Sequence, residues 1–523
     1  MADSTIPIGS GPAEHPLSRA VTIAVLAASL MVGAFAISSQ SYWIDEAFSL
    51  IVATASSPAE AWKYMQAVSG STLQMPLYQT YLYVWHKFFG GGEWAMRASN
   101  LPWFLFGQLA FLVLLRHKPR LALTACLLAA VSPILWMYLD ETRPYVMQYA
   151  AACWLAAALV RLLPAEPAPA PTRPPLLVTA TVVAAIVVLF ASSLIGVVWA
   201  TAYTAALFFV LRGRPNSEAT AMPRNVWLVL LFTLVLLVGF ASYYVITWSD
   251  AGRGYHRSGA SLLSLPFIAY ELLGFSGFGP GKITMRAEPV ASVLRCIPTL
   301  APLAVVLGLL AFYAARICVK RADWPRKTIF AWALALGLPL VAIFGAMFLI
   351  DFRVLPRHFV PAAPALIIAI AALIQSALQA GSIFWRTLAV MLPLLWLASS
   401  LSFRWQPKHA KDNYREASAI AAAALRENKE VWWAADPAAA HIYFTPIALE
   451  KVPGRAWAMQ APSWDGFRFK FPPRLIVISK PDIYDPQGAV ARYAAENRFV
   501  VAQQLQAFTI FTREGEGLPS AGP

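Results

Sequence analysis

Hydrophobic residues gather along this chain in eleven long apolar blocks that polar segments separate. Each block is close to the roughly 20 residues that an α-helix needs to cross a bilayer. The blocks are residues 20–39, 98–115, 121–138, 146–163, 176–193, 194–211, 226–248, 293–315, 328–350, 359–378 and 387–403. The pattern predicts an all-α polytopic membrane protein with about eleven transmembrane helices.

Two junctions between blocks carry further information. Residues 164–175 (PAEPAPAPTRPP) form a linker rich in proline and alanine. Because proline lacks a backbone N–H and clashes with the preceding turn, this linker cannot continue a helix and must separate two spans. The blocks 176–193 and 194–211 meet at Ser192-Ser193 with almost no loop, which predicts a tight helical hairpin.

Two segments between blocks are longer than simple connections. Residues 40–97 contain two stretches, 58–68 and 76–89, in which apolar and aromatic residues recur at helical spacing. Such stretches are typical of helices that lie along the membrane surface, where aromatic rings prefer to sit. The second long segment, residues 249–292, is rich in glycine, arginine and tyrosine.

The C-terminal residues 404–523 follow a different pattern, and no apolar run among them is long enough to span a membrane. Helical patterns at 413–427, 436–443 and 486–497 alternate with strand-like runs at 430–433 and 475–478. Alternation of this kind indicates a small α/β domain. We therefore expect a transmembrane domain at residues 1–403 and an α/β domain at residues 404–523.

Composition agrees with a membrane protein. Of the 523 residues, 59% are hydrophobic and only 13% are charged, whereas soluble domains have about 25% charged residues. Disordered, collagen-like and small disulfide-stabilised proteins are excluded. The four cysteines, Cys126, Cys153, Cys296 and Cys318, form no CxxC motif and are interpreted as small packing residues.

The net charge of +14 is best explained by topology, and we expect no nucleic-acid partner. Basic residues prefer cytoplasmic loops, and a cytoplasmic N-terminus places most of them there. They are Arg116, Lys118, Arg120, Arg161, Arg173, Arg212, Arg214, Arg224, Arg316, Lys320, Arg321, Arg326, Lys327 and Arg386. Eleven spans then place residues 404–523 on the outer face. The alternative is that the first block is a signal peptide with a cleavage site at Ala34-Phe35-Ala36.

Acidic residues near a membrane are costly and need a reason. Asp45-Glu46 follow the first span and Asp140-Glu141 follow the third, so both pairs are expected at the outer boundary. Facing pairs of carboxylates can deprotonate an acceptor or hold a divalent cation. The plainer alternative is that they are solvated or cap helix ends.

Several basic residues on the expected outer face are not explained by topology: Arg97, Arg143, Arg253, His256, Arg257, Lys282, Arg286, Arg353, Arg357 and His358. The run 253–257 (RGYHR) is dense enough to grip an anion, since guanidinium pairs bidentately with phosphate oxygens. Pairing with lipid headgroups is the alternative. Acidic pairs beside this cluster suggest a phosphorylated lipid at the membrane surface with a base next to it.

Residues 42–50 (YWIDEAFSL) resemble the aspartate-containing first-loop motif of C-type (GT-C) glycosyltransferases. The closer resemblance is to family 39, the protein O-mannosyltransferase-like group, with relatives among lipid A aminoarabinose and rhizobial galacturonosyl transferases. It continues through 75–78 (MPLY), 89–90, 93–97 (EWAMR) and 132–145, and more weakly through 353–364. The resemblance covers roughly residues 20–400.

The resemblance implies a GT-C fold and an inverting transfer of a sugar from a polyprenyl-phosphate donor. It maps the base or acceptor-orienting aspartate onto Asp45, and the acidic residue of the second outer loop onto Glu141. Family members usually have His or Lys before Pro-Pro-Leu, where this chain has Gln74-Met75-Pro76-Leu77. The donor phosphate must then be held elsewhere, by Arg253, Arg257 or Lys282, and aminoarabinose is disfavoured as the sugar.

These observations predict a multi-pass glycosyltransferase of the bacterial inner membrane. It would move a sugar to an envelope glycolipid, polysaccharide or protein on the periplasmic face, among membrane lipids. The predicted catalytic residues are Asp45, Glu46 and Glu141, and the predicted substrate-binding residues are Asp140, Arg143, Tyr145, Arg253, Tyr255, His256, Arg257, Lys282, Arg357 and His358. No cofactor is expected to be required, while a divalent cation (Mg²⁺ or Mn²⁺) stays open. The alternatives are a lipid or polysaccharide transporter or flippase, and a membrane-anchored binding protein.

Overall fold

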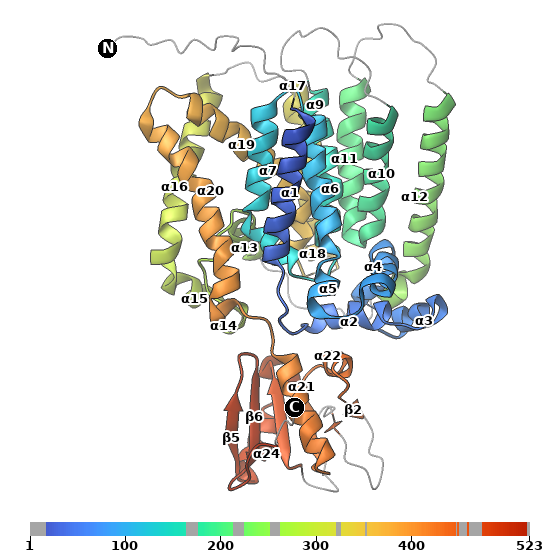
Figure 1. The fold of residues 1–523 in the computed structure, drawn as a ribbon, viewed down its shortest axis with the longest axis vertical. Helices are drawn as coiled ribbons and strands as arrows, with labels where there is room; N and C mark the ends of the chain where they lie inside the picture. The colour runs from blue at the N-terminus through green and yellow to red at the C-terminus, as the bar shows by residue number, and fades with distance from the viewer. Residues whose placement is uncertain are drawn as a thin grey trace.

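The computed structural model describes residues 17–519, except 69, 164–175, 213–223, 252–261, 321–325, 351–352, 446, 449–457 and 460–472. Its helices form a bundle, and a small sheet lies beyond one end of that bundle (Figure 1). The predicted linker at 164–175 lies outside the described residues.

The apolar blocks are helical, as the hydrophobic pattern predicts. The bundle consists of α1 (Arg19–Ala36), α6 (Asn100–Leu114), α7 (Pro119–Ala130), α8 (Pro133–Leu139), α9 (Tyr145–Leu162), α10 (Leu176–Ser192), α11 (Leu194–Arg212), α12 (Arg224–Ala251), α16 (Ile297–Lys320), α17 (Arg326–Trp332), α18 (Leu338–Leu349), α19 (Ala363–Gln379) and α20 (Ile383–Trp405). Among the described residues, eight helices are long and apolar enough to cross a membrane, or nine if the bent pair α7–α8 is one span. The shorter α6 and α10 run alongside them (Figure 1).

Two of the predicted blocks are interrupted. The block 121–138 is not one straight helix, because α7 and α8 meet at an angle of 56° before Pro133, which cannot donate a helical hydrogen bond. The block 328–350 contains a π-helical turn at Ala333–Gly337 between α17 and α18. Local widening of this kind accommodates one extra residue within a helix.

The centre of the bundle is α9, whose side chains are buried on almost every side. Its alanine-rich sequence lets α6 approach closely: a Cβ added at Gly107 would lie 3.3 Å from the Cα of Ala150. Cys126 and Cys153 are buried here, in agreement with a packing role. Cys296 is half-buried and Cys318 is exposed, so the predicted packing role is wrong for Cys318.

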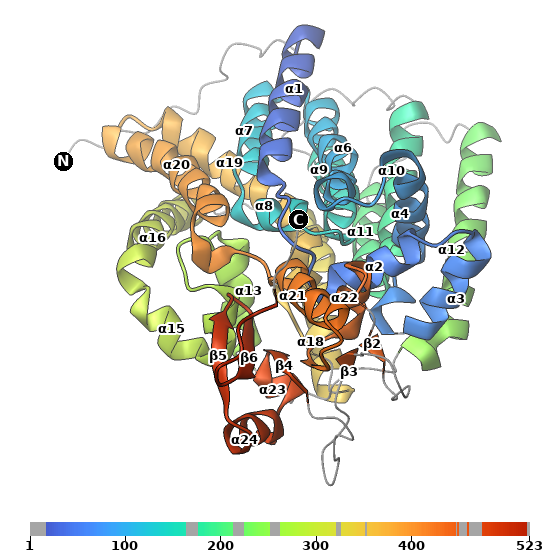
Figure 2. The same ribbon diagram turned by 60° about the horizontal axis from the view of Figure 1, so that its bottom comes forward.

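Short helices cover the end of the bundle nearest the sheet. They are α2 (Ile44–Ala53), α3 (Pro58–Val68), α4 (Pro76–Phe89), α5 (Glu93–Arg97), α13 (Ser264–Leu272), α14 (Lys282–Ala287) and α15 (Pro289–Arg295). The bounds of α3 and α4 match the two predicted surface helices. Figure 2 shows α2, α3 and α4 as a group at one side of this end.

The C-terminal part contains α21 (Tyr414–Arg426), β1 (Val431–Ala434), α22 (Pro437–Ile442), β2 (Ile447–Ala448), β3 (Ala458–Met459), β4 (Leu475–Ser479), α23 (Pro481–Tyr484), α24 (Ala489–Glu496), β5 (Phe499–Gln504) and β6 (Phe508–Arg513). The strand order is β2-β3-β1-β4-β6-β5. Strands β1 and β4 pair in parallel, with Val431 opposite Leu475, while β6 pairs antiparallel to both β4 and β5. The predicted helices and strands are all present, and β2, β3, β5 and β6 are additional.

Candidate active site

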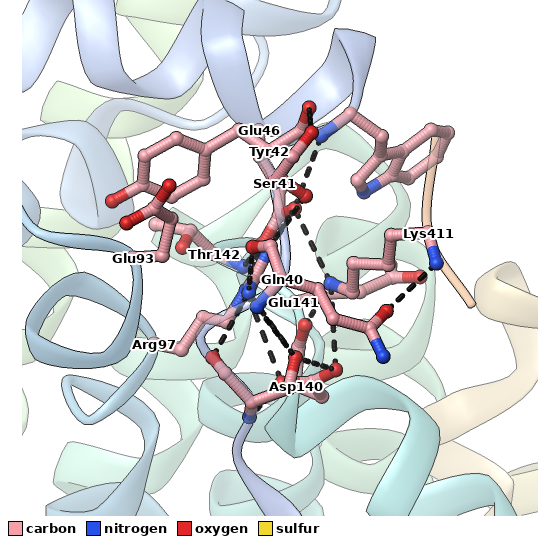
Figure 3. A network of polar contacts seen from close by, with 12 residues as sticks. Gln40, Ser41, Tyr42, Glu46, Glu93, Arg97, Asp140, Glu141, Thr142 and Lys411 are labelled. Carbon is pink, nitrogen blue, oxygen red and sulfur yellow. Dashed lines mark hydrogen bonds and ion pairs between the residues drawn. The ribbon is translucent and has the colours of Figure 1, made fainter. Parts of the chain in front are cut away.

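Both predicted acidic pairs come together at the end of the bundle that carries the sheet. Asp45 and Glu46 lie in the first turn of α2, and Asp140 and Glu141 follow α8. Three further elements meet them there: α5, α14 and the 3₁₀ helix η3 (Pro356–Ala362). Figure 3 shows the part of these polar contacts that surrounds Glu46, Arg97, Asp140 and Lys411.

Glu46 is the centre of this network and has no exposed surface. Its carboxylate pairs with the buried Arg97 guanidinium, with Nη2 at 2.8 Å and Nε at 2.9 Å, and also accepts from the Thr142 backbone N–H at 2.9 Å. Lys411 Nζ lies 3.2 Å away. Burial alone raises the pKa of Glu46, but Arg97 and Lys411 outweigh it and hold the pKa at about 2. A fully paired, enclosed carboxylate has no free position for a substrate, so we interpret Glu46 as a residue that holds these loops together.

Asp140 belongs to the same network. It accepts from the backbone N–H and the hydroxyl of Ser38, at 2.5 and 2.8 Å, and lies 3.7 Å from Lys411 Nζ. Lys411 also donates to the Asp140 backbone carbonyl. A lysine from the segment after α20 therefore connects the two acidic pairs.

Asp45 lies in different surroundings, because it keeps 22% of its side chain exposed. Arg357 Nη1 donates to it at 2.8 Å and is itself 27% exposed. Arg143 donates to the Asp45 backbone carbonyl and to Ser49, both at 3.2 Å. Burial works to raise the pKa of Asp45, yet the Arg357 and Arg143 charges lower it below its ordinary value. Asp45 is thus ionised at neutral pH and reachable from outside.

Glu141 extends this group of charged residues to α14. Its carboxylate pairs with Lys282 Nζ at 2.9 Å, and this lysine keeps 68% of its side chain exposed. The Lys282 ammonium also lies 5.4 Å from the centre of the Trp43 ring, within the range of a cation–π contact.

A cavity of about 110 Å³ opens beside Glu141 and Lys282. Its wall combines aromatic side chains, among them Trp43, Trp136 and Tyr270, with charged groups from the bundle and from the segment after α20. Glu271, from α13, is one of these and is only 9% exposed. Concave sites with aromatic walls and a few polar groups are typical of small-ligand binding.

Three further parts of the predicted site are Tyr145, which lies beside Arg143, then His358, and the run 253–257. Tyr145 is buried and packs against Tyr138, with ring centres 4.7 Å apart. His358 Nδ1 accepts from the backbone N–H of Leu355, which is a contact within η3. The predicted anion-binding run, with Arg253, Tyr255, His256 and Arg257, lies outside the described residues.

Four residues of this region are missing from the predicted set: Trp43, Arg97, Glu271 and Lys411. Trp43 and Arg97 lie inside the quoted motifs, so their sequence context was a usable signal. Glu271 is a lone acidic residue in an apolar stretch, which also marks a costly position. Lys411 carries no sequence signal, because it reaches the site only through the path of the chain after α20.

The described residues contain no group of three or more His, Cys, Asp or Glu side chains that could hold a metal ion. Asp45, Glu46, Asp140 and Glu141 are instead each paired with arginine or lysine. Such a donor set does not fit a divalent cation, which prefers several free oxygen ligands.

Comparison with solved structures identifies the fold. ArnT from Cupriavidus metallidurans in the apo state matches with a TM-score of 0.51 and 14% sequence identity, over 94% of this chain and 97% of that chain. ArnT from the same organism bound to undecaprenyl phosphate matches with a TM-score of 0.53 and 13% identity, over 96% of this chain and all of that chain. This chain has a GT-C glycosyltransferase fold.

The GT-C fold confirms the resemblance that the first-loop motif predicts. The match covers the sheet as well as the bundle, because it extends over nearly the whole of both chains. No family model and no curated protein sequence matches this chain. At 13–14% sequence identity, this similarity shows the fold alone, and the reaction has to be inferred from the residues of the site.

Proposed function

We propose that this protein is an inverting glycosyltransferase that uses a polyprenyl-phosphate sugar as donor. The acceptor would be an envelope glycolipid, polysaccharide or protein at the periplasmic face of the inner membrane. The observation that carries this proposal is the Asp45–Arg357 pair, which is partly exposed at the end of a GT-C bundle while the neighbouring Glu46 is sealed.

The charges suit a lipid phosphate. Arg357, Arg143 and Lys282 bring three cations to one end of the bundle, and Arg357 and Lys282 retain exposed surface. Guanidinium groups bind phosphate oxygens through paired hydrogen bonds, and they stabilise negative charge that develops on a leaving group. The ArnT structure bound to undecaprenyl phosphate supports this class of donor for the shared fold.

The reaction needs two groups besides these cations. The acceptor hydroxyl must lose its proton as its oxygen bonds to the anomeric carbon, and the electron pair of the broken carbon–oxygen bond stays on the polyprenyl phosphate. Asp45 is our first assignment as the base or as the group that orients the acceptor. Glu46 and Asp140 position the loop that carries it, through Arg97 and Lys411.

Transport is less well supported. Transporters place ionisable residues near the middle of the membrane, whereas the paired carboxylates described above lie beside α2, α5 and α14 at one end of the bundle (Figure 1). An end position is where the headgroup and phosphate of a lipid-linked donor would be found.

The proposal can be tested with the purified full chain in lipid nanodiscs. A panel of undecaprenyl-phosphate hexoses and pentoses would be offered with an envelope glycolipid extract, and release of undecaprenyl phosphate would be measured. Asp45→Asn should reduce release by about 10²–10⁴-fold, the range for loss of a general base or orienting carboxylate. Asp482→Asn is the matched control, because Asp482 lies in α23 and forms an exposed pair with Arg286. Wild-type protein that releases no undecaprenyl phosphate from any donor would contradict the proposal.

A further inference from the structure

Glu271 differs from the other carboxylates of this region. Asp45, Glu46, Asp140 and Glu141 each have a lysine or arginine nitrogen within 4.0 Å. Within the described part of the chain the Glu271 carboxylate has no such cation, and its one hydrogen-bond partner is the Tyr138 hydroxyl at 3.5 Å. A buried carboxyl without a paired cation is unusual, because the charged form is poorly solvated there.

The side chain of Glu271 faces a small cavity at the same end of the bundle. It lines the cavity of about 110 Å³ together with Lys282, Glu141 and Lys411. The titratable and charged groups that act on it most strongly come from three neighbouring parts of the chain: Lys282 from α14, Glu141 and Tyr138 from α8 and the loop after it, and Arg357 from η3. Asp140, Arg404, Lys411 and Asp412 also line the cavity. Lys408 and His409, from the segment after α20, line the same cavity.

This environment gives Glu271 the acid–base properties that Asp45 lacks. Burial raises the pKa of Glu271 to about 7, and Glu141 adds to the increase, although Lys282 opposes it. The pKa of Asp45 is lowered by Arg357 and Arg143. A general base works best when its pKa is near the working pH, because a carboxylate of low pKa is ionised but accepts a proton poorly.

We propose that Glu271 is the general base that removes the proton from the acceptor hydroxyl. This inference rests on the proposed function. The hydroxyl proton passes to the Glu271 carboxylate as the acceptor oxygen forms its bond to the anomeric carbon. The bond between that carbon and the phosphate oxygen breaks, and its electron pair stays on the polyprenyl phosphate.

Asp45 then has the second of the two roles considered for it, which is to orient the acceptor. Its pair with Arg357 holds the carboxylate in place for that role. The acceptor hydroxyl would then lie in the cavity beside Glu271. The aromatic side chains that line this cavity, Trp43, Trp136 and Tyr270, favour a saccharide as the chemical class of the acceptor.

The test is a pH–rate profile of the full chain in nanodiscs, measured with the donor that the wild type uses best. The wild-type kcat/KM should rise through about pH 7, as Glu271 loses its proton. Glu271→Gln should lower kcat by about 10²–10⁴-fold and remove this rise, while the affinity for undecaprenyl phosphate alone stays unchanged. Glu288→Gln is the matched control, because Glu288 is exposed at the start of α15 and pairs with Arg295.

The outcomes separate this inference from the proposed function. An active wild type whose Glu271→Gln variant keeps the rate and the rise near pH 7 would overturn the inference and leave the glycosyltransferase proposal standing. A wild type without turnover of any donor would overturn both. If Glu271→Gln fails to fold, the pH–rate profile of Glu271→Asp is measured in its place. A lower kcat together with a shift in the pH at which kcat/KM rises supports the inference, and an unchanged profile contradicts it.

Discussion

The adjacent residues Asp45 and Glu46 show how differently two carboxylates of one motif can be used. Successive residues of a helix point about 100° apart, so the first turn of α2 directs Glu46 into the protein and leaves Asp45 at the surface. Glu46 meets Arg97 and Lys411 with no exposed area, whereas Asp45 meets Arg357 with 22% of its side chain exposed. Glu46 therefore stabilises the structure of the site, whereas Asp45 is accessible to a ligand.

We expect Glu46→Gln to lower thermal stability strongly at neutral pH. Loss of one partner of a buried ion pair leaves the other charge uncompensated, which costs about 3–5 kcal/mol. The pKa of Glu46 is about 2 in the folded chain, against 4.5 ordinarily. A lowered pKa stabilises the fold above about pH 4.5, and this contribution is lost as the pH falls toward 2.

Melting temperatures of wild type and Glu46→Gln between pH 7 and pH 3 provide the measurement. The difference in melting temperature between wild type and Glu46→Gln should be constant above about pH 5 and should become smaller below it. Glu427→Gln is the control, since Glu427 forms an exposed pair with Lys429, and surface pairs contribute about 0–1 kcal/mol. A gap that is small at pH 7 would show that Glu46 is not a structural anchor.

At the scale of elements, the hairpin of α10 and α11 depends on a single glycine. Only Ser193 separates the two helices, and Gly196 lies against the last turn of α10. A Cβ added at Gly196 would come 2.0 Å from the Leu189 carbonyl oxygen, which is backbone and cannot move aside cheaply. The close approach explains how two spans can meet with almost no loop.

Gly196→Ala should therefore unfold or rearrange this hairpin. We expect a large fall in melting temperature and in the yield of monodisperse protein, because relief of the contact requires the two helices to separate. Gly239→Ala in α12 is the matched control: nothing lies within 4 Å of its added Cβ, so alanine should be neutral or stabilise the helix by up to about 1 kcal/mol. Equal stability of the two variants would contradict the steric argument.

At the scale of the whole molecule, the C-terminal part is joined to the site. Ala47 of α2 is buried in the same apolar cluster as Tyr414 and Ala417 of α21. Tyr443, after α22, donates to Glu93 at 3.1 Å and accepts from the Tyr42 backbone N–H at 2.8 Å. The loop that carries Asp45 is thus held between the bundle and the C-terminal part.

We expect Lys411→Met to weaken that connection. Methionine has a side chain of similar length but lacks the ammonium group that forms ion pairs with Glu46 and Asp140. Loss of a hydrogen bond to a charged group should cost about 1.5–3 kcal/mol. Faster proteolysis or hydrogen exchange at residues 38–46, together with a lower transfer rate, is the expected result. Lys429→Met, at an exposed pair, should match wild type, and equal protection in both variants would contradict a positioning role for Lys411.

The orientation of the molecule is open to a direct test. The basic run 316–327 includes the last residues of α16 and the first residues of α17, and these two helix ends lie at the end of the bundle opposite the sheet (Figure 1). Since basic loops remain in the cytoplasm, fusions near Lys320 should be active only with cytoplasmic reporters, and fusions after residue 404 only with periplasmic ones. A cytoplasmic C-terminal fusion would reverse the orientation and place the site on the wrong face for the proposed donor.

Sequence alone determined the elements of this protein, because their signals are local. Apolar blocks near the length of a bilayer predict helices, and the aromatic spacing of 58–68 and 76–89 predicts α3 and α4 to the residue. The motif around Asp45 also predicts the GT-C fold that the comparison with ArnT supports. The strands β5 and β6 were missed, since short strands near the end of a chain depend on their neighbours in the sheet.

Tertiary structure alone decided which charges meet. The two residues of each ion pair at the site are separated by more than a hundred positions, so their order in the sequence does not predict that they meet. The pairs are Asp45–Arg357, Glu141–Lys282, Glu46–Lys411 and Asp140–Lys411. Burial, too, is a property of the folded chain. It encloses Glu46, leaves Asp45 partly exposed, and places Glu271 at a cavity with no lysine or arginine of the described residues paired to it. Desolvation and pairing depend on what other helices bring to the same place.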